Sequence, residues 1–285
     1  MIDLHTHTTA SDGRDTPAEL VARAAAAGVS VLAVTDHDTV AGCKAAATAA
    51  AAAGIEFVDG IEITAMRAGG DVHMLGYFFD RHSPALLDFL QQQRLQRIER
   101  VREMVARLAA NGIELNADAI VQPAIENPAK SAGRPWIARA LVAAGVVADA
   151  NEAFAKWLSR GRPGYVPRAA ASPAEVFARI HDAGGIASLA HPSLVGQDSW
   201  IDEFASHGLD AVEAYHSEHD QPATARYLAI AARLNLLVTG GSDYHGDSAH
   251  GPNAPGRVSL PRDQFDRLSA VAQTKKNHRV TESQR

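Results

Sequence analysis

The sequence predicts an α/β protein in which a (β/α) barrel of parallel strands is interrupted once by a helical insertion. Short β-branched apolar runs alternate with Ala-rich helical stretches up to about residue 79, a rhythm typical of parallel strands joined by helices. The strand pattern disappears between residues 83 and 166 and then returns. The chain has 285 residues, 46% of them hydrophobic, which is enough to bury the core of a barrel. We therefore expect residues 1–82 and 167–285 to form the barrel and residues 83–166 to form the insertion, a cap over the barrel.

The first part of the barrel is predicted from four strands and two helices. Leu20 and Val21 give the first helix an apolar stripe, and Gly28 and Gly54 stand where the C-caps of the two helices belong. The strands are expected at Met1–His5, Val29–Thr35, Glu56–Thr64 and Asp71–Phe79, and the helices at Pro17–Ala27 and Val40–Ala53.

The insertion has the periodicity of helices. Apolar side chains recur at helical spacing between Leu86 and Ala110, which predicts a long amphipathic helix. Shorter helices are expected at Asp118–Ile125, Pro135–Ala144 and Ala150–Leu158. The barrel then resumes with helices at Pro173–Ala183 and Ala223–Leu234 and strands at Ile186–Ala190, Ala211–Tyr215 and Leu236–Thr239. A last helix follows Pro261, and the basic residues Lys275–Arg279 are expected to form a frayed terminus.

Charge and composition narrow the classes of protein. A formal net charge of −6 argues against a surface that coats nucleic acid, although it leaves room for a small basic pocket. The single cysteine, Cys43, excludes an intrachain disulfide and a Cys-based zinc site. The N-terminus lacks the features of a signal peptide and no apolar run is long enough to span a bilayer, so we expect a cytoplasmic protein without a membrane partner. No obligate protein partner is expected.

Histidines and carboxylates stand at or near the ends of the predicted strands. His5 and His7 alternate along an extended segment, so both imidazoles point the same way and can bind one metal ion. Because the C-terminal ends of parallel strands converge on one face of a barrel, we expect the other ligand-type residues to join them there. The nine residues are His5, His7, Asp12, His37, Glu62, His73, His191, Asp243 and His245.

Metal binding explains the nine residues better than a structural role. A single histidine at a strand end is more often a hydrogen-bonded structural residue, but nine ionisable groups crowded at one face would cost several kcal/mol each to bury unpaired. Divalent cations offset that cost. A mixed set of imidazoles and carboxylates without thiolate suits manganese, iron(II) or zinc.

These motifs resemble those of the PHP (polymerase and histidinol phosphatase) superfamily and follow its order along the chain. The matching segments are Asp3–His7, Thr35–Asp38, Gly60–Glu62, His73, Ala190–Pro192 and Gly241–His245. The resemblance implies a distorted (β/α)7 PHP barrel with three divalent metal ions, Mn2+ first, with Fe2+ and Zn2+ as alternatives. It implies one metal held by His5, His7, Glu62 and Asp243, a second by Glu62, His73 and His191, and a third by Asp12, His37 and His245. Glu62 would bridge two metals, and Glu62, His191 and Asp243 are expected to be catalytic.

Within the superfamily the chain most resembles small phosphoesterases that act on nucleoside 3′,5′-bisphosphates and on the ends of short RNAs. That branch shares the aspartate found here at position 12, where many other members carry histidine. Gly133–Ala138 resembles a segment of its insertion, with Trp136 in place of a histidine. The residues expected to bind substrate are Lys130, Arg134, Arg160 and, at the end of a strand, His216.

We therefore expect a metal-dependent phosphatase that removes the 3′-phosphate of nucleoside 3′,5′-bisphosphates such as 3′-phosphoadenosine 5′-phosphate, with 5′-phosphorylated short RNA as a further substrate. Two alternatives use the same motifs: a histidinol-phosphate-like phosphatase of small phosphomonoesters, and a catalytically silent PHP scaffold domain. Amidohydrolase chemistry is a third, which is disfavoured because the barrel lysine expected for it is not evident.

Overall fold

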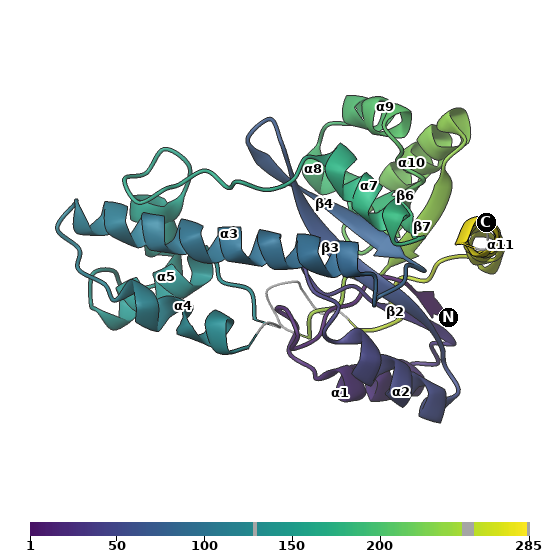
Figure 1. Ribbon diagram of the computed structural model, residues 1–285, viewed down its shortest axis with the longest axis horizontal. Helices are drawn as coiled ribbons and strands as arrows, with labels where there is room; N and C mark the ends of the chain where they lie inside the picture. Colours follow the sequence, from purple (N-terminus) through teal and green to yellow (C-terminus); the bar gives the residue numbers. More distant parts are fainter. Residues whose placement is uncertain (128–129, 247–253, 284–285) are drawn as a thin grey trace. The chain divides into compact units, whose positions relative to one another are not determined.

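The barrel is built on a seven-stranded sheet whose strands lie in chain order (Figure 1). The computed structural model describes residues 1–127, 130–246 and 254–283. The backbone N–H of Leu4 donates to the carbonyl oxygen of Gly240 at 3.2 Å, so the chain after the first strand meets the last strand and nearly closes the barrel. This confirms the predicted distorted α/β barrel. The strands are β1 (Ile2–Asp3), β2 (Val31–Val34), β3 (Glu56–Arg67), β4 (Gly70–Tyr77), β5 (Ile186–Leu189), β6 (Ala211–His216) and β7 (Leu237–Gly241).

One strand runs against the others, so the expectation of parallel strands throughout is wrong. β4 pairs antiparallel with both β3 and β5, whereas the remaining neighbours are parallel. Ala68 and Gly69 join β3 to β4 with φ angles of 51° and 77°, the positive values that two-residue hairpins require. Glu62 therefore lies in the middle of β3 rather than at its end, and His73 comes from the antiparallel partner. Alternation of apolar and polar residues predicts a strand but not its direction.

Two of the helices that pack on the sheet begin at a capping box that the sequence supplies. Thr16 and Ser172 each form a capping box with the glutamate three residues later, Glu19 and Glu175, and a proline follows each cap in the first turn. These helices follow the predicted ranges to within a few residues. They are α1 (Pro17–Ala26), α2 (Cys43–Ala53), α7 (Pro173–Asp182) and α10 (Gln221–Leu234).

Two short helices between β5 and β6 lie outside the predicted elements. They are α8 (Pro192–Val195) and α9 (Ser199–Ser206). α9 buries only Ile201 and Phe204, so its apolar pattern is too brief to give a helical period. Among the described residues, no helix is both long enough and apolar enough to cross a membrane.

The basic segment Lys275–Arg279 is helical rather than frayed, because it belongs to α11 (Arg262–Ser283). Lys275 Nζ lies 3.0 Å from Asp210 Oδ1 and donates to the carbonyl oxygen of Gly185 at 3.2 Å. Asp210 also accepts hydrogen bonds from His181 Nε2 at 2.6 Å and from the Ala187 N–H at 2.9 Å. Because Asp210 is 65 residues away from Lys275 in the chain, the local composition around Lys275 could not predict this contact.

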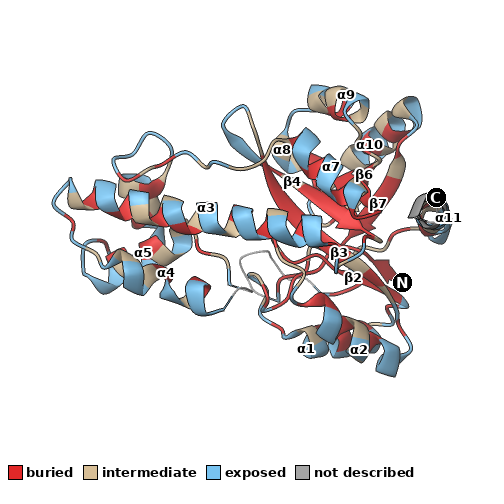
Figure 2. Ribbon diagram, in the orientation of Figure 1, coloured by how far each residue is buried: buried red, intermediate tan, exposed pale blue. Residues whose placement is uncertain are grey.

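Residues 90–170 form a compact unit of their own, and residues 1–89 with 171–285 form the other. Figure 2 shows buried and exposed turns alternating along α3 (Pro84–Ala109), as expected of a long amphipathic helix. The hydrophobic core of the unit of residues 90–170 includes Met104, Leu108, Val121 and Ile137. The stretch predicted as one helix, Ala150–Leu158, is a short α-helix followed by a π-helical turn. The other elements are α4 (Ala117–Glu126), α5 (Arg134–Ala143), α6 (Ala150–Ala153) and η1 (Phe154–Leu158).

We predict that Asp210→Ala lowers the free energy of unfolding by about 2 kcal/mol at pH 7, because it leaves the buried Ala187 N–H, a ring N–H of His181 and the Lys275 ammonium without their acceptor. Burial raises the pKa of Asp210, but the hydrogen bonds from His181 and Ala187 outweigh it and hold the pKa below its usual 3.8. A carboxyl with a depressed pKa stabilises the fold above its unfolded value and loses that contribution as the pH falls.

The difference between wild type and Asp210→Ala should therefore be constant from pH 7 to pH 5 and shrink below pH 3.8, as measured by urea denaturation. Asp182→Ala is the control, since that carboxylate is 58% exposed and forms an ion pair with Arg179 at 3.6 Å. Equal losses in the two variants would contradict the role given to Asp210.

Candidate metal centre

Loops that follow four of the parallel strands carry ligand-type side chains to one end of the barrel, where they meet side chains from the β3–β4 hairpin. Isolated backbone bridges join Thr6 to Tyr244 and His37 to Glu62, so these loops continue the barrel past its named strands. The ligand-type residues are His5 and His7 after β1, His37 after β2, Glu62 in β3, His73 in β4, His191 after β5, and Asp243 with His245 after β7.

Two buried carboxylates fix the loops without joining any metal-ligating group found among the described residues. Asp3 accepts hydrogen bonds from the N–H and hydroxyl of Ser242 at 2.9 and 2.7 Å. Asp36 accepts from the N–H and hydroxyl of Thr8, both at 2.7 Å, and from the hydroxyl of Ser11 at 2.8 Å. Because bonds to a charged acceptor are about twice as strong as neutral ones, these residues hold the histidine-bearing loops in place.

Four ligand atoms gather at the centre of the site. His5 Nε2 lies 3.4 Å from Glu62 Oε2 and 3.3 Å from Asp243 Oδ1. His7 Nε2 lies 3.3 and 3.2 Å from the same two oxygens. Two atoms that ligate one cation at about 2.1 Å in tetrahedral or octahedral geometry lie about 3.0–3.4 Å apart. The separations fit a shared divalent cation.

The second oxygen of Glu62 faces a different pair of histidines. Glu62 Oε1 lies 2.8 Å from His73 Nδ1 and 3.0 Å from His191 Nε2, while Oε2 also lies 3.1 Å from His37 Nδ1. The side chain of Glu62 is only 1% exposed. A carboxylate whose two oxygens face separate sets of imidazoles has the geometry of a bridging ligand.

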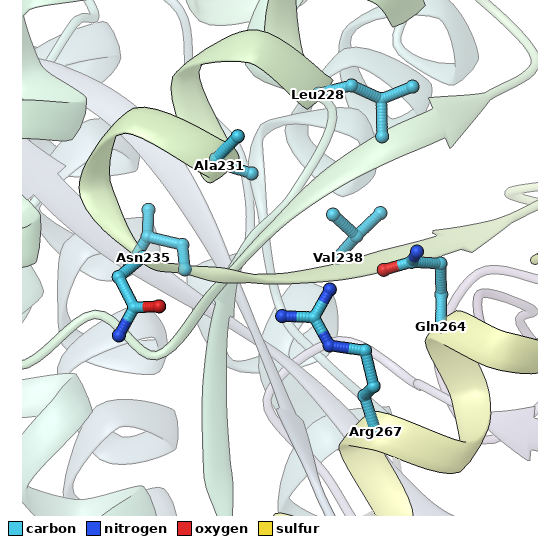
Figure 3. A pocket seen from close by; sticks show the side chains of 8 residues that line it. Leu228, Ala231, Asn235, Val238, Gln264 and Arg267 are labelled. Atoms are coloured by element: carbon cyan, nitrogen blue, oxygen red, sulfur yellow. The ribbon is translucent and has the colours of Figure 1, made fainter.

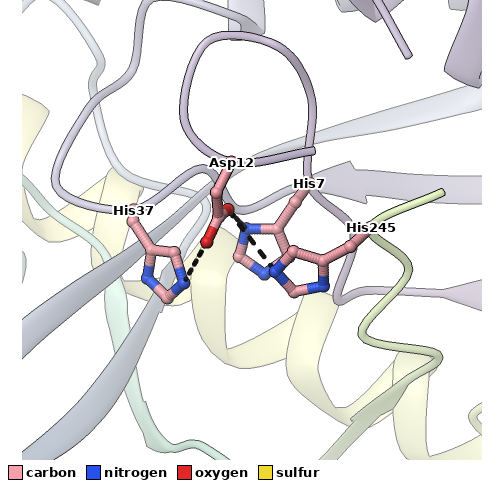
Figure 4. A group of neighbouring side chains, drawn as sticks. All are labelled: His7, Asp12, His37 and His245. Atoms are coloured by element: carbon pink, nitrogen blue, oxygen red, sulfur yellow. Dashed lines mark ion pairs between the residues drawn. The ribbon is translucent and has the colours of Figure 1, made fainter. Parts of the chain in front are cut away.

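A third group surrounds Asp12 (Figure 4). Its oxygens lie 3.4 Å from His245 Nε2, 3.5 Å from His37 Nε2 and 3.7 Å from His7 Nδ1. The set implied by the resemblance has three members, and the structure adds His7 as a fourth neighbour. A neutral imidazole has one lone pair, so His7 can ligate a metal in this group or in the central one but not in both. Asp12 is 52% exposed, which makes this the most open of the groups.

Unsatisfied nitrogen atoms show that the site fits metal ions. Within the described residues, both ring nitrogens of His7 and Nδ1 of His37 are buried without a hydrogen-bond partner. Leaving a buried polar atom unpaired costs about 1–3 kcal/mol. Imidazole lone pairs and carboxylate oxygens face one another here, and a divalent cation is a partner that both can bind.

Two residues of the site adopt a backbone conformation that residues other than glycine rarely adopt. His191 has φ of 25° and Asp243 has φ of 52°, both outside the usual regions for residues other than glycine. Such conformations cost about 1–3 kcal/mol each and persist where surrounding contacts hold them, typically at functional sites. Here the N–H of His191 donates to Glu213 at 2.7 Å and the N–H of Asp243 to the carbonyl of His5 at 2.8 Å.

The charges of the protein keep the carboxylates ionised. Burial raises the pKa of Glu62 and of Asp243, yet the surrounding histidines outweigh it and hold both pKa values well below their usual range. Burial lowers the pKa of His37 to about 4. In His245 burial acts in the same direction, but the bond to Asp12 and the charge of Asp243 outweigh it and raise the pKa to about 9. Metal ligands must be deprotonated, a condition that the carboxylates and His37 already meet.

Glu213 is a buried carboxylate of the centre that the sequence reasoning does not single out. It is fully buried in β6 and accepts from His5 Nδ1 at 3.0 Å as well as from the His191 N–H. Carboxylates that accept the second ring N–H of a metal-bound histidine set its tautomer and orientation. The available signal was its place in the strand that ends at His216, three residues later.

The residues expected to bind substrate lie in two places. His216 is completely buried, with Nε2 3.4 Å from Asp243 Oδ2, inside the metal centre. Lys130 and Arg160 are exposed and Arg134 is half-buried, all within the unit of residues 90–170. The Arg134 guanidinium lies over the ring of Phe154 at 5.7 Å. Trp136 packs against the core of the same unit, which gives it a packing role there.

A cavity of about 270 Å³ lies between α10, β7 and α11 (Figure 3). Leu228, Leu236 and Val238 give it apolar walls, and Arg267 brings a guanidinium to it. Leu236 and Val238 stand at the start of β7, the end opposite to Asp243. The lining contains no histidine or carboxylate, so this cavity is separate from the metal chemistry.

Known proteins share this fold and sequence. Residues 3–118 match the PHP domain family. The chain is 36% identical over 265 residues to a 3′,5′-nucleoside bisphosphate phosphatase of Chromobacterium violaceum, which spans 91% of this chain and 92% of that protein. It is 35% identical over 255 residues to a 5′-3′ exoribonuclease of Haemophilus influenzae, which spans 85% and 89%. The crystal structure of a proposed metal-dependent phosphoesterase from Bifidobacterium adolescentis matches with a TM-score of 0.79 at 35% identity, covering 94% of this chain and 95% of that one.

Barrel, ligand constellation and relatives together define a metal-dependent phosphoesterase. The chain belongs to the PHP domain family. This confirms the resemblance inferred from the motifs, and it sets aside the expectation of a catalytically silent scaffold.

We predict that Glu62→Ala removes more metal and more activity than Asp12→Ala. Glu62 faces five histidines from a fully buried position, whereas Asp12 is half exposed and faces one group. Outer-shell partners of metal ligands are worth about 10–100-fold in affinity or activity, so losing a bridging ligand should cost more than about 100-fold in kcat.

Elemental analysis of the purified variants, with circular dichroism to establish that both are folded, measures the effect. Equal or reversed losses of metal in the two variants would remove Glu62 from the bridging position. Wild type should also lose its activity after exhaustive chelation and regain it when a divalent metal is added back.

Proposed function

We propose that this enzyme hydrolyses the 3′-phosphate of nucleoside 3′,5′-bisphosphates such as 3′-phosphoadenosine 5′-phosphate. The observation that carries the proposal is the 36% identity, over most of both chains, to a relative named for that activity. The basic segment around Arg134 supports it, because a substrate with two phosphates needs cations besides the metal ions.

The proposed metal ligands are the nine residues expected from the sequence, in three sites, with Mn2+ as the first choice and Fe2+ or Zn2+ as alternatives. Bound divalent cations would neutralise charge on the phosphoryl oxygens and activate water as the nucleophile at neutral pH. Glu62 and Asp243 would hold two of the sites in register, since their oxygens lie within 3.4 Å of His5 and His7. His191 would complete the second site, with its backbone oriented by Glu213.

Arg134 is the residue that we propose for the second phosphate, with Lys130 and Arg160 assisting. Phe154 restricts the guanidinium by packing under it, so less side-chain entropy is lost on binding. Arg134 also begins α5, where Gly133 leaves the backbone N–H groups without a side-chain cap. Guanidinium can bind phosphate through two parallel hydrogen bonds, and the positive end of the helix dipole favours the same charge.

Short RNA with a 5′-phosphate is the second candidate substrate. It is favoured by the exoribonuclease of Haemophilus influenzae, which is 35% identical to this chain. The same metal site and the same arginine would serve both, since each substrate carries a 5′-phosphate on the nucleoside whose 3′-oxygen bears the reacting phosphate. We propose that the enzyme works in the cytoplasm, because its one cysteine, Cys43, is free and buried and suits a reducing compartment.

We predict that wild type prefers a nucleoside 3′,5′-bisphosphate over the matching 3′-monophosphate by about tenfold to 150-fold in kcat/KM, since a charge-assisted bond is worth about 1.5–3 kcal/mol. Arg134→Ala should erase most of this preference and leave hydrolysis of para-nitrophenyl phosphate unchanged, because that substrate has no second phosphate. Arg139→Ala is the matched control, an exposed arginine on the same helix that should keep the preference.

Steady-state kinetics on the two nucleotides, with a 5′-phosphorylated oligoribonucleotide as a third substrate, decide between the candidates. A wild-type enzyme indifferent to the 5′-phosphate would favour a phosphatase of small monoesters such as histidinol phosphate. A kcat/KM that is higher on the oligonucleotide than on the bisphosphate would make short RNA the principal substrate.

A further inference from the structure

Several histidines of the metal centre donate a hydrogen bond from Nδ1 to an acceptor oxygen. His5 Nδ1 faces Glu213 Oε1 at 3.0 Å, and His245 Nδ1 faces the carbonyl oxygen of Asp243 at 2.9 Å. Carboxylate and carbonyl oxygens can only accept, so both Nδ1 atoms must carry the hydrogen. When such a ring loses its other hydrogen to bind a metal ion, its lone pair lies at Nε2, as metal ligation requires.

His216 has the opposite arrangement. The backbone N–H of Glu218 donates to His216 Nδ1 at 3.1 Å. A backbone amide nitrogen cannot accept a hydrogen bond, so Nδ1 must hold the lone pair and the neutral ring must carry its hydrogen on Nε2. This is a local contact within the turn that ends β6, and it fixes the tautomer independently of the metal centre.

The Nε2–H group of His216 points into the centre without an aligned partner. The side chain is 0% exposed, and among the described residues Nε2 has no hydrogen-bond acceptor. Its nearest carboxylate oxygen is Asp243 Oδ2 at 3.4 Å, and its ring centroid lies 5.3 Å from that of His191. A buried donor left unpaired is costly, so an acceptor oxygen of a ligand beside Nε2 would be stabilised.

By distance alone His216 could be taken for a metal ligand, since it forms a group with His5 and Asp243. The tautomer argues against this, because a ring nitrogen that carries hydrogen has no lone pair to give. Of these three neighbouring residues, His5 and Asp243 can therefore ligate a metal ion, whereas His216 can donate a hydrogen bond.

We propose that His216 is a catalytic residue whose Nε2–H donates a hydrogen bond to a phosphoryl oxygen of the substrate, and that it is not a metal ligand. The proposal rests on the metal ligands proposed above. The phosphoryl oxygens of a phosphate ester carry negative charge through the transition state, and a fixed donor in a buried site stabilises that charge without having to reorganise. Asp243 would ligate with one oxygen while the donor lies beside the other.

The test compares His216→Leu and His216→Gln with wild type in metal content, kcat and thermal stability. Leucine fills the space without a donor, and glutamine returns an amide N–H near the position of Nε2. We expect both variants to bind as much metal as wild type by elemental analysis. We expect His216→Leu to lose about 100–1,000-fold in kcat, as when one donor to a developing oxyanion is removed, and His216→Gln to recover at least about tenfold of that loss.

His5→Ala provides the comparison, since it removes a proposed ligand and should lower the metal content. If His216→Leu loses metal to the same extent as His5→Ala, His216 is a ligand and the proposal fails. If His216→Leu keeps its metal and its kcat, or if glutamine restores nothing while both variants stay folded and loaded, donation to the substrate is refuted. A wild-type protein that binds no metal would instead refute the proposed metal centre.

Discussion

Glu62 lies fully buried in the middle of β3, and both of its oxygens face imidazole nitrogens at 2.8–3.4 Å. Burying one carboxylate among five histidines is costly unless the charges are balanced, and the histidines lower the pKa of Glu62 against the effect of burial. The barrel interior has to satisfy this one group. The convergence of the strand-end loops, the antiparallel return of β4 and the carboxylates that fix the loops all serve that requirement.

Hydrogen bonds behind the ligand-type residues decide what those residues can do. Glu213 orients His5 through its side chain and His191 through its backbone. The N–H of Glu218 gives His216 the opposite tautomer. Histidines with similar distances to the centre therefore differ in chemistry, because one hydrogen atom separates a metal ligand from a hydrogen-bond donor. Residue type and spacing alone cannot express this difference.

Much of the fold could be predicted because local signals were strong. The apolar periodicity of the helices, clearest in α3, and the glycines at the ends of α1 and α2 predicted several helices to within a few residues. Strand direction could not be predicted, since the hairpin through Ala68 and Gly69 gives the same alternation as a parallel pair. The tail around Lys275 is helical because of contacts with distant residues, which no window of sequence contains.

The sequence by itself determined the chemistry available to this protein: a set of histidines and carboxylates in the order of a PHP domain, with one cysteine and no thiolate site. It did so because the type of each side chain and the order of the motifs can be read from the chain alone. Only the tertiary structure decided how these groups share their partners: that Glu62 faces two sets of histidines, that His7 stands between two groups, and that Glu213 supports the centre from behind. These are distances between residues far apart in the chain, and only the closed barrel sets them.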